Sequence, residues 1–162
     1  MTASHPEIRL LAPGEAALYR NIRLEGLKQK PEAFSSTIER QNAMPLSWFA
    51  ERIVRGNIFG GFAGDELLGV AGYWPQEGAK VCHVCAKVGA HLGLGERLIE
   101  AVVSHASGRI EQLQLGVASD NQAPYRLYKK TAFSEYGREM KALKQDGRDV
   151  DEILMVRFLT QA

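Results

Sequence analysis

Apolar residues recur at helical spacing in the N-terminal third of the chain. Glu15–Lys30 is predicted to be a helix that ends before the next proline. A second helix begins at Pro45 and has an apolar face. The residues on that face, at offsets of three and four, are Leu46, Phe49, Ala50, Ile53 and Val54. Pro31–Met44, between the two helices, is polar and is predicted to be a long connection around Phe34.

Strands and two further helices are predicted for the rest of the chain. Glu96–Ala106 has apolar residues at helical offsets, and another helix, capped by Asp120 or Asn121, runs to about Thr131. Short runs rich in apolar and β-branched residues, bounded by Gly, Pro and Asp, predict the strands. These are Glu7–Leu11, Ile58–Ala63, Leu67–Trp74, Lys80–Cys85, Gln112–Val117, Phe133–Leu143 and Asp149–Leu159. The last two should form a hairpin across Asp146-Gly147.

The order of these elements is β-α-α-β-β-β-α-β-α-β-β, with no internal repeat, linker or low-complexity run. It predicts an α/β fold, a mixed sheet with helices on its faces. The parallel part should join Lys80–Cys85 to Gln112–Val117 through a right-handed helical crossover.

Composition narrows the class of protein. The 162 residues are 45% apolar and 24% charged, which suits one globular domain and argues against disorder. A net charge of +1 gives no reason to expect nucleic acid or a membrane surface as partner. The N-terminus shows neither a signal peptide nor a transmembrane pattern, and two cysteines, Cys82 and Cys85, fit a reducing compartment, so we expect a cytoplasmic protein.

A glycine turn between a strand and a helix is the first candidate for chemistry. Gly93-Leu94-Gly95 follows the strand Lys80–Cys85 and opens the helix that ends at Ala106. The first N–H groups of a helix have no internal partner, and glycines let a phosphate approach the backbone closely. We therefore expect Leu92–Glu96 to cradle a phosphate or pyrophosphate. A dinucleotide fingerprint is excluded because Leu98 stands where a third glycine is needed, and a P-loop because its lysine is missing.

The Cys82-x-x-Cys85 pair, with His83 and His91 nearby, raises the alternatives of zinc or redox chemistry. Within a strand, Cys82 and Cys85 point to opposite faces, and no second ligand pair exists. A redox Cys-x-x-Cys normally opens a helix, which this pair does not. Structural cysteines and no metal site are the better interpretation.

The element order and two motifs resemble the Gcn5-related N-acetyltransferase (GNAT) family over nearly the whole chain. The family's Q/R-x-x-G-x-G/A signature is matched at Gly93 and Gly95, whereas Ala90 departs from Gln or Arg. A second run, N-x-x-A-x-x-L-Y-x-K-x-G-F, resembles Asn121 followed by Leu127-Tyr128-Lys129-Lys130-Thr131-Ala132-Phe133, with Ala132 at the usual glycine. The resemblance implies one domain over residues 1–162. It also implies a mostly antiparallel central sheet, splayed between the fourth and fifth strands.

The resemblance further implies an acetyl-CoA-dependent N-acetyltransferase. Its acceptor would be the primary amine of a small molecule, an amino acid or a protein N-terminus. The backbone that binds acetyl-CoA, as a cosubstrate, would include the splayed fourth strand, the glycine turn and the start of the fourth helix. The implied binding residues are Val84, Cys85, Ala86, Ala90, His91, Leu92, Gly93, Leu94, Gly95, Glu96, Asn121 and Tyr128. Asn121 could equally cap its helix.

A phenol of pKa about 10 can protonate a thiolate whose thiol has a pKa of about 8.5, and the resemblance implies that this phenol is Tyr128. Its alternative role is a core residue. His83 is the candidate base, with a strand-edge histidine bonded to backbone as the alternative. Ala90 also keeps open a different class of protein, a catalytically weak acetyl-CoA sensor or protein-binding module of this fold. A homodimer stays open as well.

Overall fold

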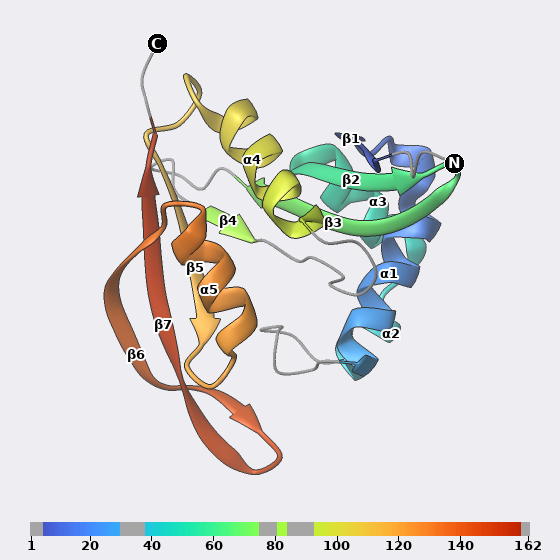
Figure 1. Ribbon diagram of the computed structural model, residues 1–162. Helices are drawn as coiled ribbons and strands as arrows, with labels where there is room; N and C mark the ends of the chain where they lie inside the picture. The colour runs from blue at the N-terminus through green and yellow to red at the C-terminus, as the bar shows by residue number, and fades with distance from the viewer. Residues whose placement is uncertain (1–4, 30–37, 75–80, 84–92, 160–162) are drawn as a thin grey trace.

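The computed structural model describes residues 5–29, 38–74 and 93–159, and the backbone of 81–83. In this part of the chain the strands form two antiparallel sheets (Figure 1). One sheet has the order β1-β2-β3-β4 and the other the order β5-β7-β6. The strands are β1 (Glu7–Leu10), β2 (Asn57–Ala63), β3 (Glu66–Trp74), β4 (Val81–His83), β5 (Gln112–Ala118), β6 (Ser134–Gln145) and β7 (Arg148–Phe158). The helices are α1 (Ala16–Gln29), α2 (Ile38–Asn42), α3 (Leu46–Arg55), α4 (Leu94–Ala106) and α5 (Gln122–Lys130), with a short 3₁₀ turn at Pro13–Glu15.

Helices cover both faces of the first sheet, as predicted. Successive strand residues point to opposite faces, so Val70 and Ala71 of β3 enter different cores. The core on one face is formed with α1 and α3 and includes Tyr19 and Phe49. The core on the other face is formed with α4 and continues under the second sheet. None of the helices in the described residues is long and apolar enough to cross a membrane.

The two sheets meet where β4 and β5 lie beside each other as edge strands (Figure 1). Within the described residues no ladder joins them, and β5 pairs with β7 alone. The central sheet is therefore split between its fourth and fifth strands, where the splay was expected. The predicted parallel pairing of these two strands is not formed in this part.

The final hairpin turns at Asp146 and Gly147, whose φ angles are +49° and +76°. Positive φ at both central residues is the geometry that matches the right-handed twist of paired strands and that Asp-Gly favours. The Asp-Gly prediction of this turn is confirmed.

Two local predictions were incomplete. Residues 31–44 were expected to be one connection, but the short helix α2 lies within them. A tertiary contact holds it: Gln41 is 2% exposed, and its Oε1 accepts a 3.0 Å hydrogen bond from Nε of the buried Arg23. Phe34 lies outside the described residues. The buried part of the apolar face of α3 is shorter than predicted, because Leu46 and Val54, near its two ends, are 49% and 68% exposed.

Candidate functional site

The N-terminus of α4 is the described part of the predicted phosphate cradle. The helix begins at Leu94, earlier than expected, so Gly95 and Glu96 belong to its first turn. Gly93 is the N-cap residue, with a left-handed φ of +85°, and a Cβ built there would meet no described atom within 4 Å. A glycine offers no capping side chain, so the N-cap residue itself leaves the first N–H groups of α4 without a side-chain partner. Together with the helix dipole, these groups suit an anion.

Packing fixes the direction in which this helix terminus points. Leu98, Ile99 and Val102 of α4 are fully buried in the core shared by both sheets. At the other end of α4, the Tyr73 hydroxyl of β3 shares a 2.6 Å hydrogen bond with His105 Nδ1. Burial, and to a lesser extent the Arg109 guanidinium, lowers the pKa of His105, which favours the neutral ring that packs there.

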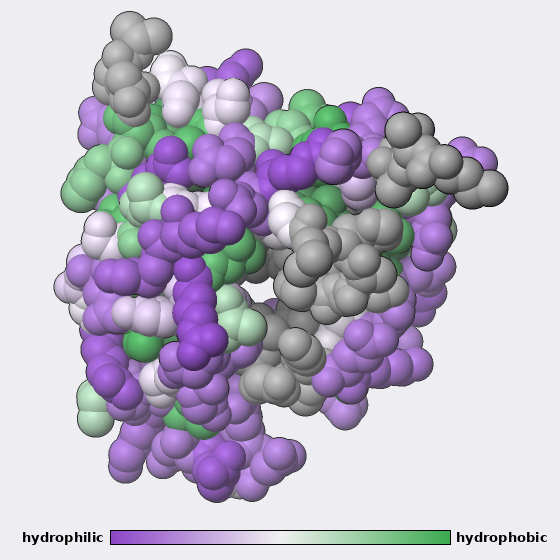
Figure 2. Space-filling model, viewed as in Figure 1, coloured by the Kyte–Doolittle hydropathy of each residue, from purple (hydrophilic) through white to green (hydrophobic). Residues whose placement is uncertain are grey.

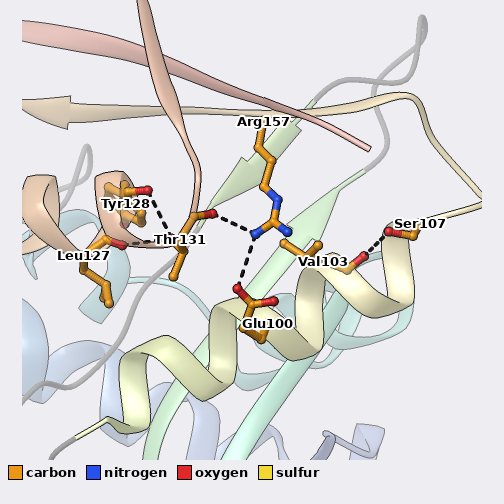
Figure 3. A network of polar contacts seen from close by, with 7 residues as sticks. All are labelled: Glu100, Val103, Ser107, Leu127, Tyr128, Thr131 and Arg157. Atoms are coloured by element: carbon orange, nitrogen blue, oxygen red, sulfur yellow. Dashed lines mark hydrogen bonds and ion pairs between the residues drawn. The ribbon is translucent and has the colours of Figure 1, made fainter. Parts of the chain in front are cut away.

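Two ion pairs link α4 to its neighbours, one to the end of α5 and one to β7. Lys130 Nζ lies 2.8 Å from Glu96 Oε2. One turn further along α4, Glu100 Oε1 is 3.3 Å from Nη1 of Arg157, which also donates a 2.7 Å hydrogen bond to the Thr131 carbonyl (Figure 3). Sequence reasoning missed both cations as partners. The spacing of Glu96 and Glu100 puts both acids on one face of α4, which signals a cationic neighbour without identifying it.

Tyr128 lies in the last turn of α5, and its side chain is in the core. It is 6% exposed and its ring meets the Phe133 ring edge to face, with centroids 5.8 Å apart. This is the placement expected for a core residue, and its role as an acid stays a prediction.

Asn121 occupies the N-cap position of α5. Its side chain makes no capping hydrogen bond, whereas its backbone N–H bonds to the Ala118 carbonyl at 2.9 Å and closes the turn after β5. The capping role that was an alternative for its side chain is therefore not seen.

The remaining predicted site residues are His83 and six residues in 84–92. His83 is the last residue of β4 and pairs in register with Gly72 of β3, although only its backbone is described. The predicted binding residues in 84–92 lie outside the described residues; these are Val84, Cys85, Ala86, Ala90, His91 and Leu92. The structure thus brings together only the α4 and α5 parts of the predicted site. In the described part of the chain, no group of three or more His, Cys, Asp or Glu side chains could hold a metal ion.

A pair of carboxylates on the second sheet was not predicted. Glu139 of β6 and Glu152 of β7 are directly opposite in register, and Glu152 packs over Gly116 of β5, where a Cβ would collide with its side chain. Burial first, and then the Glu139 charge, raises the pKa of Glu152. The pairing depends on register shifts in β6, which have no simple sequence signal.

Acetyltransferases are among the solved structures that share this fold. A GNAT-family acetyltransferase from Streptococcus pneumoniae superposes with a TM-score of 0.82 at 21% identity, over 95% of this chain and 99% of that one. The protein yncA from Salmonella typhimurium, solved with its cofactor acetyl-CoA, has a TM-score of 0.77 at 16% identity, over 98% and 96% of the two chains. The ribosomal-protein-S18-alanine N-acetyltransferase from Escherichia coli has a TM-score of 0.74 at 17% identity, over 97% and 96%.

No curated protein matches the sequence significantly. The family model for acetyltransferases of the GNAT family, however, matches residues 23–133, from α1 through α4 and α5 to Phe133. Most of the chain is included in that match, and the fold and the glycine-capped α4 agree with it. The chain therefore belongs to the acetyltransferase (GNAT) family.

Proposed function

We propose that residues 1–162 act as one N-acetyltransferase domain. It would transfer an acetyl group from acetyl-CoA to a primary amine of a small molecule, an amino acid or a protein N-terminus, by direct attack of the amine on the thioester. The observation that carries the proposal is the open, left-handed Gly93 at the start of α4, in a chain of this family.

The described residues fit the cosubstrate of the family, acetyl-CoA. Its pyrophosphate needs several N–H donors and a close approach to the backbone. The first turn of α4, from Leu94 to Glu96, supplies N–H groups, and Gly93 before it carries no Cβ. Figure 2 shows the surface hollowed beside α5, on the side that faces α1 and α2 in Figure 1. When bound, acetyl-CoA supplies an activated acetyl thioester.

The chain's own residues would then manage two protons. An amine with a pKa of about 10.4 costs roughly 4–5 kcal/mol to deprotonate at pH 7, and we assign that task to His83. Tyr128 would donate its proton to the departing thiolate. The backbone of Val84, Cys85 and Ala86 would pair with the pantetheine amides, and an N–H there would polarise the acetyl carbonyl.

The alternative function is an acetyl-CoA sensor or protein-binding module. Its motivation is Ala90, where the family signature has Gln or Arg, because the missing cation weakens the hold on the phosphates. Backbone N–H groups supply most of that hold, so we favour the enzyme.

An assay of free-thiol release separates the two classes. Acetyl-CoA is incubated with the chain and a panel of polyamines, free amino acids and peptides with unblocked N-termini. The Escherichia coli relative is named for acetylating an alanine of a ribosomal protein, so a peptide beginning with alanine belongs in the panel. An enzyme releases thiol in proportion to acetylated amine found by mass spectrometry. Binding of acetyl-CoA without thiol release from any amine would favour the sensor.

A further inference from the structure

We propose that Lys130 tunes the affinity of the α4 N-terminus for the phosphates of acetyl-CoA by neutralising Glu96. The inference rests on the proposed function, because it concerns the same cosubstrate. It adds Lys130 as a positioning residue that acts through Glu96.

The position of Glu96 creates the need for a cation. It is the third residue of α4 after the Gly93 N-cap, so its carboxylate belongs to the first turn, whose N–H groups would receive the pyrophosphate. A negative side chain there is favourable for the helix dipole but repels an incoming phosphate. Lys130 Nζ, 2.8 Å from Glu96 Oε2, both neutralises the carboxylate and holds it toward α5.

The backbone beside Lys130 is fixed by a network of hydrogen bonds (Figure 3). The Thr131 hydroxyl donates to the carbonyls of Leu127 and Tyr128, at 2.8 and 3.2 Å. The Thr131 carbonyl accepts the 2.7 Å hydrogen bond from Arg157. Lys130 therefore projects from an anchored helix end, which favours a persistent contact with Glu96.

The ion pair should affect folding stability and acetyl-CoA affinity to different extents. The side chains of Lys130 and Glu96 are 67% and 39% exposed, so the pair contributes little to folding stability. The unpaired Glu96 charge, by contrast, would act on a ligand that carries several negative charges. Loss of Lys130 should weaken acetyl-CoA binding about three- to tenfold at low salt, and less at high salt.

Calorimetric titration of variants in which a charged side chain is replaced by glutamine tests the role of Lys130. Lys130→Gln should weaken acetyl-CoA binding, whereas S-acetylpantetheine, which lacks the phosphates, should bind as it does to the parent. Lys130→Arg should restore acetyl-CoA affinity. In the Lys130→Gln background, Glu96→Gln should also restore it, because no charge is left to neutralise. The matched control is Lys129→Gln, since Lys129 is the exposed neighbour in the same helical turn.

The outcomes separate this inference from the proposed function. If the parent chain binds no acetyl-CoA, both are overturned. If the parent binds but Lys130→Gln weakens binding no more than Lys129→Gln, only the role of Lys130 is overturned. Equal weakening of acetyl-CoA and S-acetylpantetheine would also overturn it, because Lys130 would then support the structure and not the phosphates.

Discussion

Tyr128 and Phe133 are joined twice at the end of α5. The Phe133 backbone N–H donates to the Tyr128 carbonyl at 2.9 Å, and their rings meet edge to face. The Ala132 N–H donates to the Lys129 carbonyl at 3.2 Å. These two hydrogen bonds and the apolar contact define a Schellman motif, which ends a helix with a left-handed residue. The run from Leu127 to Phe133, which contains the candidate acid Tyr128, therefore also forms the C-terminal cap of α5.

Replacing Ala132 should stabilise the protein. Ala132 has a φ of +66°, which its Cβ disfavours and which glycine adopts without that strain. Ala132→Gly should raise the free energy of unfolding by about 0.5–1 kcal/mol, measured by urea denaturation. As a control, Ala123→Gly in the first turn of the same helix should lower it by up to about 1 kcal/mol. A destabilised Ala132→Gly variant would show that the residue is not strained.

Tyr128→Phe separates the two roles of this tyrosine. The ring, and with it the contact to Phe133, is kept, so packing should survive. If Tyr128 is the general acid, the turnover number should fall about 10²–10⁴-fold in the thiol-release assay. Acetyl-CoA affinity should change by under about 1 kcal/mol, the worth of one hydrogen bond. Full turnover with a lowered melting temperature would instead make Tyr128 a core residue alone.

The sequence predicted those features that depend on local pattern. Helical offsets and short apolar runs predicted the element order apart from α2, and Asp146-Gly147 predicted the final hairpin. Features that depend on contacts between distant segments were missed. The helix α2 is five residues long and is held by the buried pair Arg23 and Gln41. A helix of this length is not stable alone, and it is too short to show a clear helical repeat of apolar residues.

The same distinction applies to the site. The sequence showed a glycine turn before α4, because such a turn has a local signal, and Gly93 is its left-handed N-cap. That this turn holds a phosphate stays a prediction. Lys130 could not be paired with Glu96 from the sequence, since they lie on different helices and only the tertiary fold brings the start of α4 near the end of α5.

Gly93→Asp tests the position of the phosphate cradle. The variant places a negative charge beside the first N–H groups of α4 and should weaken acetyl-CoA binding about tenfold or more. Gly64→Asp in the β2–β3 turn is the matched control, because Gly64 also has a positive φ, +60°, and open space around its Cβ position. Both variants bear similar backbone strain, but only Gly93→Asp should lose affinity. Parent-like binding by Gly93→Asp would mean that the phosphates lie elsewhere.

The raised pKa of Glu152 predicts a pH dependence of stability. A carboxyl group that binds its proton more tightly in the folded state stabilises the fold when protonated, and this contribution is lost as the pH rises through the folded-state pKa. Glu152→Gln, which cannot ionise, should therefore gain stability relative to the parent between pH 4 and pH 7, values that bracket this loss. Urea denaturation at both values measures it. Glu139→Gln, which removes the opposing charge, should show a smaller gain of the same sign, and a gain for neither variant would contradict the pairing.

The central claim is that the N-terminus of α4 binds the phosphates of acetyl-CoA. Its most direct test is calorimetric titration of the parent chain with acetyl-CoA and, separately, with S-acetylpantetheine. We predict that acetyl-CoA binds with a dissociation constant between about 1 μM and 1 mM, the usual range of KM values, and that S-acetylpantetheine binds at least about tenfold more weakly. No binding of acetyl-CoA, or equal binding of both compounds, would contradict the claim.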